Sequence, residues 1–168
     1  MDSFSIILVV VLLILVILSA FFSGSETSIM ALNQIKLDNA EKQGNKSAKI
    51  INSLRKEINR VLGVILIGNN LVNISASALL TFFVIKKFGD EYVWIGTLLL
   101  TIFIIIFAEI APKSFAAKRP ESIAYPASRI LKVLTKYLGS FSEILTNISN
   151  SLTGIKNNEN YFSENLNR

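Results

Sequence analysis

The sequence predicts an all-α integral membrane protein with three transmembrane helices, juxtamembrane amphipathic helices and a third span kinked at a proline. Hydrophobic residues make up 51% of the 168 residues, and the mean hydropathy is +0.51. They are concentrated in three blocks, each at least 18 residues long: Ser5–Phe22, Val61–Ile85 and Tyr92–Ala111. A helix needs about 20 apolar residues to cross a hydrocarbon core of about 30 Å. Each block therefore predicts one span.

The first block resembles a signal peptide in length but lacks its other features. No basic residue precedes it and no clear small-residue cleavage site follows it, so we expect a retained helix. Gly44 is expected to end a helical extension of this span. Next, Ala48, Ile51, Leu54 and Ile58 recur at helical spacing among basic residues. This pattern predicts a basic amphipathic helix that lies in an anionic inner leaflet.

A second amphipathic pattern follows Pro120, with apolar residues every three or four positions as far as Leu152. Its basic residues, Arg129, Lys132 and Lys136, argue against a fourth crossing, because each is costly within the bilayer. We therefore expect an interfacial or partner-binding helix. The membrane domain is predicted over residues 1–155. Residues 156–168 are polar and are predicted to form a tail or linker toward cytoplasmic domains absent from this chain.

The distribution of charge predicts the orientation in the membrane. The net charge is +5, and the positive excess lies in Ala31–Arg60 and in the segment after the third block. The short loop Lys86–Glu91 is balanced. Because positive residues favour the cytoplasm, we expect a multi-pass protein of the cell membrane with its N-terminus outside and its C-terminus inside. This topology accounts for the basic residues, and no nucleic-acid partner is predicted.

The absence of cysteine and histidine limits the chemistry. It excludes thiolate and imidazole metal ligands and catalysis by these side chains. A bound metal would need oxygen ligands, which favours hard cations. The sequence also lacks a nucleotide-binding fingerprint and a nucleophile–base pair, so we do not expect an enzyme.

The first predicted span ends in serines. Ser19 and Ser23 lie one helical turn apart and share a face, and Ser25 follows closely. Serines at such positions also occur as small packing residues or bond to a carbonyl of the preceding turn. For a single serine, the sequence leaves both interpretations open.

The second span carries three amides, Asn69, Asn70 and Asn73. Asn69 and Asn73 stack on one face, whereas Asn70 points about 100° away. Amides in lipid need partners, and one amide would indicate a contact between helices. Three in five residues favour a polar, ligand-binding cavity.

The third span contains Glu109, the only charged residue in the three blocks. An acid inside the membrane is a functional candidate. Pro112 lacks an N–H and should free carbonyls around Phe107–Glu109, which gives a cation site in outline. The alternative is an ion pair between Glu109 and Lys113, one turn apart. The oxygen donors of the three spans suit Mg²⁺, Ca²⁺ or Na⁺.

Three segments together resemble the membrane domain of the CorC/cyclin M (CNNM) family of magnesium transporters. They are FSGSET at residues 22–27, LIGNNLVN at residues 66–73 and AEIAPK at residues 108–113. The resemblance covers roughly residues 6–152. It implies Mg²⁺ transport, with Na⁺-coupled export as the usual proposal. It also implies a homodimer with an ion site between the spans. Ala108 departs from the glycine common in the family, and the pair of regulatory CBS domains that usually follows is absent from this chain.

The resemblance implies an ion site formed by Ser23, Ser25, Asn69, Asn73 and Glu109, with support from Ser19, Asn70, Pro112 and Lys113. We therefore expect a Mg²⁺ exporter that works by alternating access around these residues and is coupled to Na⁺. Two alternatives remain: a Mg²⁺-sensing membrane anchor that acts through cytoplasmic domains, and a divalent cation channel.

Overall fold

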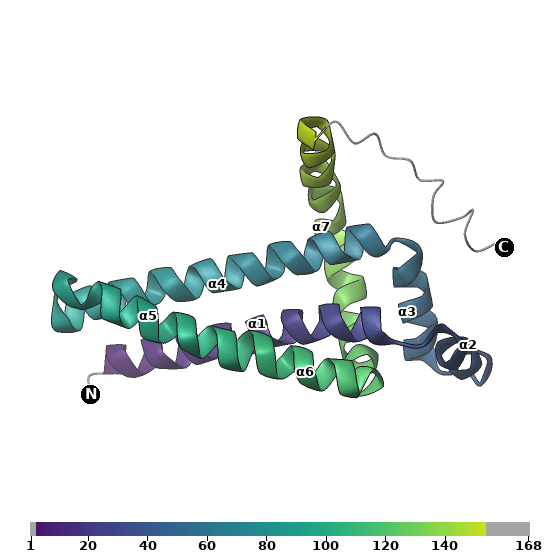
Figure 1. Cartoon of the computed structure of the whole chain (residues 1–168), viewed down its shortest axis with the longest axis horizontal. Coiled ribbons are helices and arrows are strands. Elements are labelled where there is room, and N and C mark those ends of the chain that lie inside the picture. The colour runs from purple at the N-terminus through teal and green to yellow at the C-terminus, as the bar shows by residue number, and fades with distance from the viewer. Residues whose placement is uncertain (1–2, 154–168) are drawn as a thin grey trace.

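The computed structural model describes residues 3–153, which are helical almost throughout (Figure 1). The third span is built from three consecutive segments, α5, η2 and α6. The predicted tail, residues 156–168, lies outside the described residues. The elements are α1 (Ser3–Ala31), α2 (Gln34–Lys42), α3 (Lys46–Lys56), α4 (Ile58–Phe88), the 3₁₀ turn η1 (Asp90–Tyr92), α5 (Val93–Phe103), the π-helix η2 (Ile104–Ile110), α6 (Ala111–Lys118) and α7 (Pro120–Thr153).

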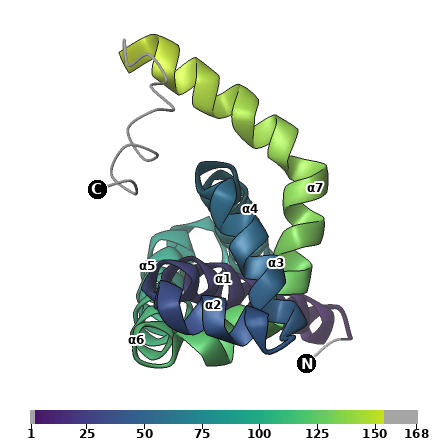
Figure 2. The same ribbon diagram turned by 90° about the vertical axis from the view of Figure 1, so that its right-hand side faces the viewer.

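The predicted three-span fold is confirmed. Within residues 3–153, three helical stretches are long and apolar enough to cross a membrane: α1, α4 and Asp90–Lys118, with mean hydropathies of 3.3, 1.6 and 2.4. They lie side by side as one bundle (Figures 1 and 2). Each is longer than its apolar block because the helices continue into polar residues at their ends. Gly89, at φ 103°, ends α4 and turns the chain into the third span.

Helices α1 and α4 pack antiparallel along most of their length. The rings of Phe4 and Phe82 lie 6.2 Å apart near one end, and Ser19 bonds to Asn69 further along. Beyond that pair, the ring of Phe22 lies against Gly68. A Cβ at Gly68 would stand 2.5 Å from Cζ of this ring, so the close approach requires glycine. These three contacts fix how the polar residues of the two helices face one another.

The predicted extension of the first span to Gly44 is wrong. Helix α1 ends at Ala31, and Asn33 starts α2 by accepting a hydrogen bond from the Lys36 N–H. The end of α1 is capped from α3: Arg55 Nη2 donates to Ile29 O in the last turn at 2.8 Å and to Leu32 O, just beyond the helix, at 2.9 Å. Burial lowers the pKa of the Arg55 guanidinium, and the nearby Asp38 carboxylate opposes this effect.

The amphipathic helix predicted within the first loop is present as α3, but its apolar face does not lie in lipid. Ala48, Ile51 and Leu54 are at most 6% exposed and belong to a core cluster shared with α1, α4 and α7. This part of the prediction is therefore wrong. Helix α3 buries its apolar face against the protein and anchors the α2–α3 hairpin to one end of the bundle.

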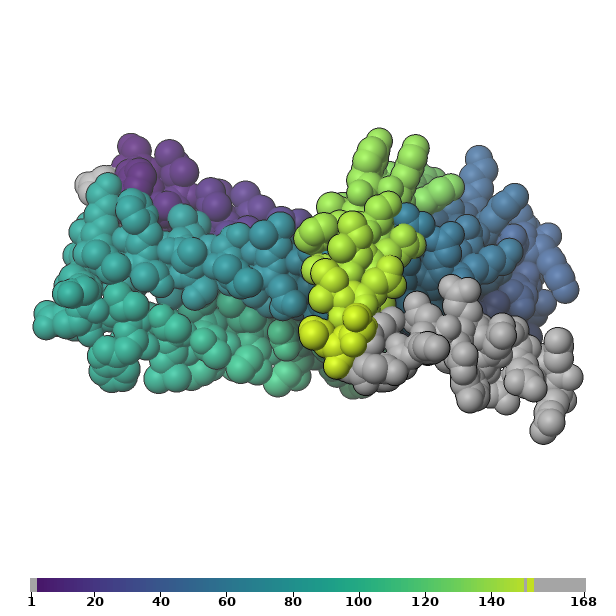
Figure 3. Space-filling view, turned by 90° about the horizontal axis from the view of Figure 1, so that it is seen from above, coloured from purple at the N-terminus to yellow at the C-terminus, as the bar shows by residue number. Residues whose placement is uncertain are grey.

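Helix α7 is the second predicted amphipathic helix, and it forms a single element of 34 residues. It crosses the spans at a steep angle and extends past α4 (Figure 1), so its yellow-green end is prominent in the view from above (Figure 3). Arg60, near the start of α4, contacts it. The Nε atom of Arg60 lies 3.3 Å from Glu143 Oε1, and its carbonyl accepts a 3.5 Å hydrogen bond from Ser142. The crossing therefore lies near the α2–α3 end of the bundle.

Candidate functional site

A direct polar contact joins two of the predicted site residues. Ser19 Oγ donates to Asn69 Oδ1 at 2.9 Å, and Ser19 is fully buried. The contact exists because both side chains occupy the face along which α1 and α4 pack. It positions a hydroxyl and an amide oxygen between two apolar helices, where water is scarce and polar groups need partners.

Three further oxygens are buried without any partner among the described residues: Ser23 Oγ, Ser25 Oγ and Asn73 Oδ1. A buried polar atom without a hydrogen bond costs about 1–3 kcal/mol, so such atoms are uncommon in folded proteins. Two of them, Ser23 Oγ and Asn73 Oδ1, belong to the packed face of α1 and α4, where a ligand would satisfy them. Hydroxyl and amide oxygens are the neutral donors that hard cations accept.

The register of α1 and α4 separates these oxygens along the bundle. Ser23 lies four residues beyond Ser19, and Asn73 lies four residues beyond Asn69, but in the opposite direction because the helices are antiparallel. At 1.5 Å per residue the two oxygens are about 12 Å apart along the axis. Since Mg²⁺ binds oxygen at about 2.1 Å, one ion cannot contact both in this conformation. The donors form a row, with the Ser19–Asn69 pair at its centre.

Ser25 does not share the face of Ser19 and Ser23. A helix turns about 100° per residue, so Ser23 lies about 40° from Ser19, whereas Ser25 lies about 120° away. Ser25 is on the side of Ile29 and Leu32, which pack in the core cluster with α3. Its hydroxyl therefore faces the juxtamembrane core rather than the row of donors.

Asn70 is exposed, in contrast to its two neighbouring amides. The sequence predicted that the Asn70 side chain points away from the face that carries Asn69, and the exposure of Asn70 agrees with this prediction. In the arrangement described here, Asn70 adds no donor between α1 and α4.

The third span changes its hydrogen-bonding pattern at the predicted kink. Residues Ile104–Ile110 form a π-helix, in which the Ala111 N–H bonds to the Ile106 carbonyl, five residues back. Pro112 follows immediately, in the first turn of α6, and cannot donate a backbone hydrogen bond. Short π segments are rare and occur often at functional sites. The sequence predicted disturbed backbone here, and the π-helix is the form that it takes.

Glu109 is the last residue but one of this π-helix and is half-buried. The position of Glu109 along the bundle follows from two contacts of α6 with α1. Pro112 lies beside Gly24, where a Cβ would be 3.6 Å from Pro112 Cβ, and Lys113 contacts Glu26. Three residues back from Pro112, Glu109 is level with the segment between Ser19 and Ser23. Within residues 3–153, the Glu109 carboxylate forms no hydrogen bond or ion pair.

The alternative pairing of Glu109 with Lys113 is not the one observed. Lys113 Nζ instead lies 3.6 Å from Glu26 Oε2, and both side chains are about half exposed. Glu26 was absent from the predicted site, although it is the only acid of α1 in the described range. Its position seven residues after Ser19, on the same helix face, was the available signal. The pair leaves the Glu109 carboxylate available to a cation.

Among the described residues, no three His, Cys, Asp or Glu side chains come close enough to hold a metal ion together. An ion here would be bound by neutral oxygens and one carboxylate, Glu109. Such a set leaves part of the positive charge of a divalent ion uncompensated. This favours passage over permanent tight binding, since affinity rises with ligand charge.

The fold and the row of oxygens define a multi-pass membrane protein whose polar groups lie between its spans. Residues 10–166 match the family model described as the cyclin M transmembrane N-terminal domain, so the chain belongs to the CNNM family, which is linked to Mg²⁺ transport. This confirms the family suggested by the three sequence segments. The members of this family are generally not enzymes.

Several curated proteins are similar to this chain. It is 49% identical to the inner membrane protein YfjD of Escherichia coli over 70% of this chain and 27% of that protein. It is 44% identical to a UPF0053 protein of Haemophilus influenzae over 77% of this chain and 31% of that protein. It is 36% identical to a DUF21 domain-containing chloroplast protein of Arabidopsis thaliana over 79% of this chain and 20% of that protein. The chain thus spans less than a third of the length of these relatives.

Proposed function

We propose that this domain carries Mg²⁺ across the membrane along the row of oxygens between α1 and α4. The observation that supports it most strongly is the burial of Ser23 Oγ and Asn73 Oδ1 without partners on either side of the Ser19–Asn69 pair. Apolar spans tolerate such atoms poorly unless a ligand satisfies them in part of the cycle. The link between the family and Mg²⁺ transport makes Mg²⁺ the first ion to test.

In the proposed mechanism, the ion occupies successive positions along the row. Breaking the Ser19–Asn69 hydrogen bond frees a hydroxyl and an amide oxygen midway between Ser23 and Asn73. Glu109 lies at this depth on the third span and supplies the negative charge. Mg²⁺ keeps several of its waters when few protein ligands are available, which suits a site with neutral donors. A shift of α1 against α4 would bring donors now about 12 Å apart closer together.

The proposal includes a direction and a coupling ion. Positive residues on α3 and α7 favour a cytoplasmic location for the α2–α3 end, with the N-terminus outside. Na⁺ prefers the same oxygen ligands and is the proposed counter-ion for Mg²⁺ export. A homodimer completes the proposed assembly. Two other functions are kept as outcomes of the test: a Mg²⁺ sensor that does not transport, and a channel.

The experiment is Mg²⁺ flux from proteoliposomes that contain this chain, measured with and without an opposing Na⁺ gradient. The test variant is Glu109→Gln, which removes the charge but preserves the shape. The matched control is Glu121→Gln, since Glu121 is an exposed acid at the start of α7. We expect Na⁺-dependent flux in the wild type and the control, and a loss of at least roughly tenfold in Glu109→Gln, or about 1.4 kcal/mol.

Other results would redirect the proposal. Flux that is independent of Na⁺ but sensitive to Glu109→Gln would indicate a channel or uniporter at the same site. Mg²⁺ binding by calorimetry without any flux would indicate a sensor. Equal flux in Glu109→Gln and Glu121→Gln would contradict the assignment of Glu109.

A further inference from the structure

Helix α7 has three distinct faces. One is buried against the bundle through Ala124, Ala127 and Leu131. A second is basic and carries Arg129, Lys132 and Lys136. The third is apolar and exposed, with side chains between 51% and 74% accessible: Ile130, Val133, Tyr137, Phe141, Ile144 and Ile148. At about 100° per residue, the centres of the apolar and basic faces lie about 110° apart, so the two faces adjoin along the helix, as in helices at a membrane surface.

The orientation of α7 agrees with such a position. It crosses the three spans at a steep angle near the α2–α3 end (Figures 1 and 2). If the spans follow the membrane normal, α7 runs along the membrane surface. Its apolar face can then contact acyl chains while its basic face remains at the level of headgroups and water.

A groove beside α7 extends this apolar face into the bundle. It has a volume of about 300 Å³ and lies between α1, α6 and α7, lined mainly by Ala20, Phe21, Gly24, Ile123, Pro126 and Ile130. Ile123, Pro126 and Ile130 belong to the apolar side of α7, whereas Ala20 and Phe21 belong to a membrane span. The groove therefore joins an apolar wall of a span to the apolar side of α7. An acyl chain matches its location and its chemistry.

The basic face of α7 forms no ion pairs with acidic side chains of the described residues. Within residues 3–153, Arg129, Lys132 and Lys136 form no ion pair, and the nearby acid Glu143 is engaged by Arg60. Lys118 and Arg119 add two positive charges directly before α7. A cluster of this kind at a membrane surface attracts anionic headgroups by about 1 kcal/mol per basic side chain.

We propose that α7 and the adjoining groove form a binding site for an acidic phospholipid, with an acyl chain between α1 and α7 and the phosphate at the basic face. The bound lipid would contact α1 at Gly24 and α6 at Pro112, which both line the groove. This site is separate from the row of ion-binding oxygens, and its existence is independent of the proposed transport.

The experiment measures lipid contact by fluorescence quenching in the full chain. Trp94 is the only tryptophan and lies exposed on α5, so Trp94→Phe gives a silent background. Ile130→Trp, at a position 51% exposed at the groove, then reports on nearby acyl chains. The protein is reconstituted in phosphatidylcholine that contains small amounts of brominated phosphatidylglycerol or brominated phosphatidylcholine. We expect brominated phosphatidylglycerol to quench the fluorescence at least about five times as strongly as brominated phosphatidylcholine.

Charge variants separate specific binding from general contact with lipid. The combined variant Arg129→Gln, Lys132→Gln and Lys136→Gln should remove the preference for phosphatidylglycerol. The matched control is the combined variant Lys36→Gln, Lys46→Gln and Lys49→Gln, which removes the same amount of charge from exposed positions of α2 and α3. This control should keep the preference for phosphatidylglycerol. Equal quenching by both lipids in the wild-type background would overturn the proposal. So would an absence of quenching, which would mean that protein, such as a second copy of the chain, covers this face.

Discussion

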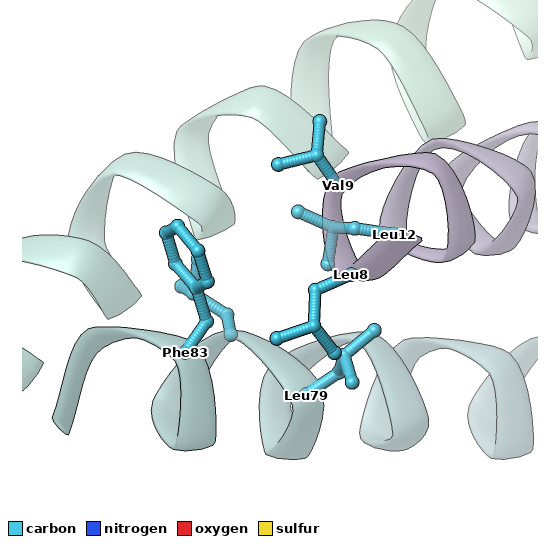
Figure 4. A pocket seen from close by; sticks show the side chains of 6 residues that line it. Leu8, Val9, Leu12, Leu79 and Phe83 are labelled. Carbon is cyan, nitrogen blue, oxygen red and sulfur yellow. The ribbon is translucent and has the colours of Figure 1, made fainter. Parts of the chain in front are cut away.

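The two halves of the α1–α4 interface differ in chemistry although the same two helices form both. Toward the N-terminus of α1, the interface is apolar: Leu8, Val9 and Leu12 face Leu79, Leu80 and Phe83 around a space of about 20 Å³ (Figure 4). Toward the α2–α3 end, the facing residues include Ser19, Ser23, Asn69 and Asn73. The six side chains drawn in Figure 4, which line this space, contain only carbon.

The comparison explains why hydropathy alone locates the spans but not their function. Both halves are hydrophobic enough to remain in the bilayer, and both are packed helix against helix. Only one half contains buried oxygens without partners. The apolar half can hold α1 and α4 together and exclude water, while the polar half is the one that we propose to exchange ligands. In the proposed transporter, the apolar half acts as the seal.

The largest expected effect comes from making the polar half resemble the apolar half. Asn73→Leu keeps the approximate volume but removes the amide oxygen. Because loss of a supporting residue around a metal costs about 10–100-fold in affinity, loss of a direct ligand should cost about 100-fold, or about 2.7 kcal/mol. Mg²⁺ titration calorimetry of the purified protein measures it. Asn70→Leu, one position away and exposed, should bind like the wild type; equal losses in both variants would contradict the difference between the two amides.

A truncation in the apolar half should affect stability and leave Mg²⁺ affinity unchanged. Leu12→Ala removes packing at the small space near Leu79 and Phe83. Leu→Ala changes in cores cost about 2–5 kcal/mol, and we expect about 2 kcal/mol because Leu12 is only partly buried. Thermal unfolding in detergent, followed by Mg²⁺ titration below the transition, tests both parts. A large fall in Mg²⁺ affinity would mean that the two halves are not separate in function.

The close approach of the helices beside the polar half provides a third test. Gly68→Ala would place a methyl group against the Phe22 ring and should destabilise the protein by about 1.5 kcal/mol through overpacking. Gly24→Ala is the matched control, since its Cβ would meet Pro112 at an ordinary 3.6 Å. Thermal unfolding of both variants gives the comparison. Equal stability would show that α1 and α4 tolerate a wider separation at Ser19 and Asn69.

The smallest expected effect is at the ion pair between Glu26 and Lys113. Both side chains are about half exposed, so Glu26→Gln should change the free energy of unfolding by about 0.2–1 kcal/mol, and less in high salt. Thermal unfolding at low and high salt measures this change. A loss above this range would show that the pair is shielded from water and has a larger role in holding α1 against α6.

Much of the fold follows directly from the sequence. Three apolar blocks without basic residues give three spans, and the apolar spacing after Pro120 gives α7. In the first loop, the amphipathic helix was predicted correctly, but its predicted position in the lipid was wrong. Spacing shows that α3 has an apolar face but does not distinguish lipid from protein as its partner. Here the partner is the cluster around Ile51 and Leu131, which forms only when distant segments meet.

The candidate site shows a similar division. Spacing placed Asn69 and Asn73 on one face of the second span and Ser19 and Ser23 on one face of the first, and the family resemblance implied that these faces meet. Ser19 does bond to Asn69. The register between antiparallel helices was not predictable from spacing within each helix. It depends on contacts such as Phe22 against Gly68, and it places Ser23 and Asn73 on opposite sides of that bond.

The central claim is that a divalent ion binds in the polar half, close to the Ser19–Asn69 pair. Mn²⁺ replaces Mg²⁺ at oxygen sites and is paramagnetic, so its distance from a nitroxide label can be measured by pulsed electron resonance. The chain contains no cysteine, so Ala31→Cys and Phe88→Cys each give a single labelling site, and both positions are exposed. Ser19 lies 12 residues from Ala31, and Asn69 lies 19 residues from Phe88.

At 1.5 Å per residue, these separations correspond to about 18 Å and about 28 Å along the bundle. We expect Mn²⁺ to lie nearer to a label at position 31 than to one at position 88, by about 10 Å along the axis, and excess Mg²⁺ to abolish both signals. A bound Mn²⁺ that lies nearer to position 88, within the apolar half, would contradict this assignment of the ion site.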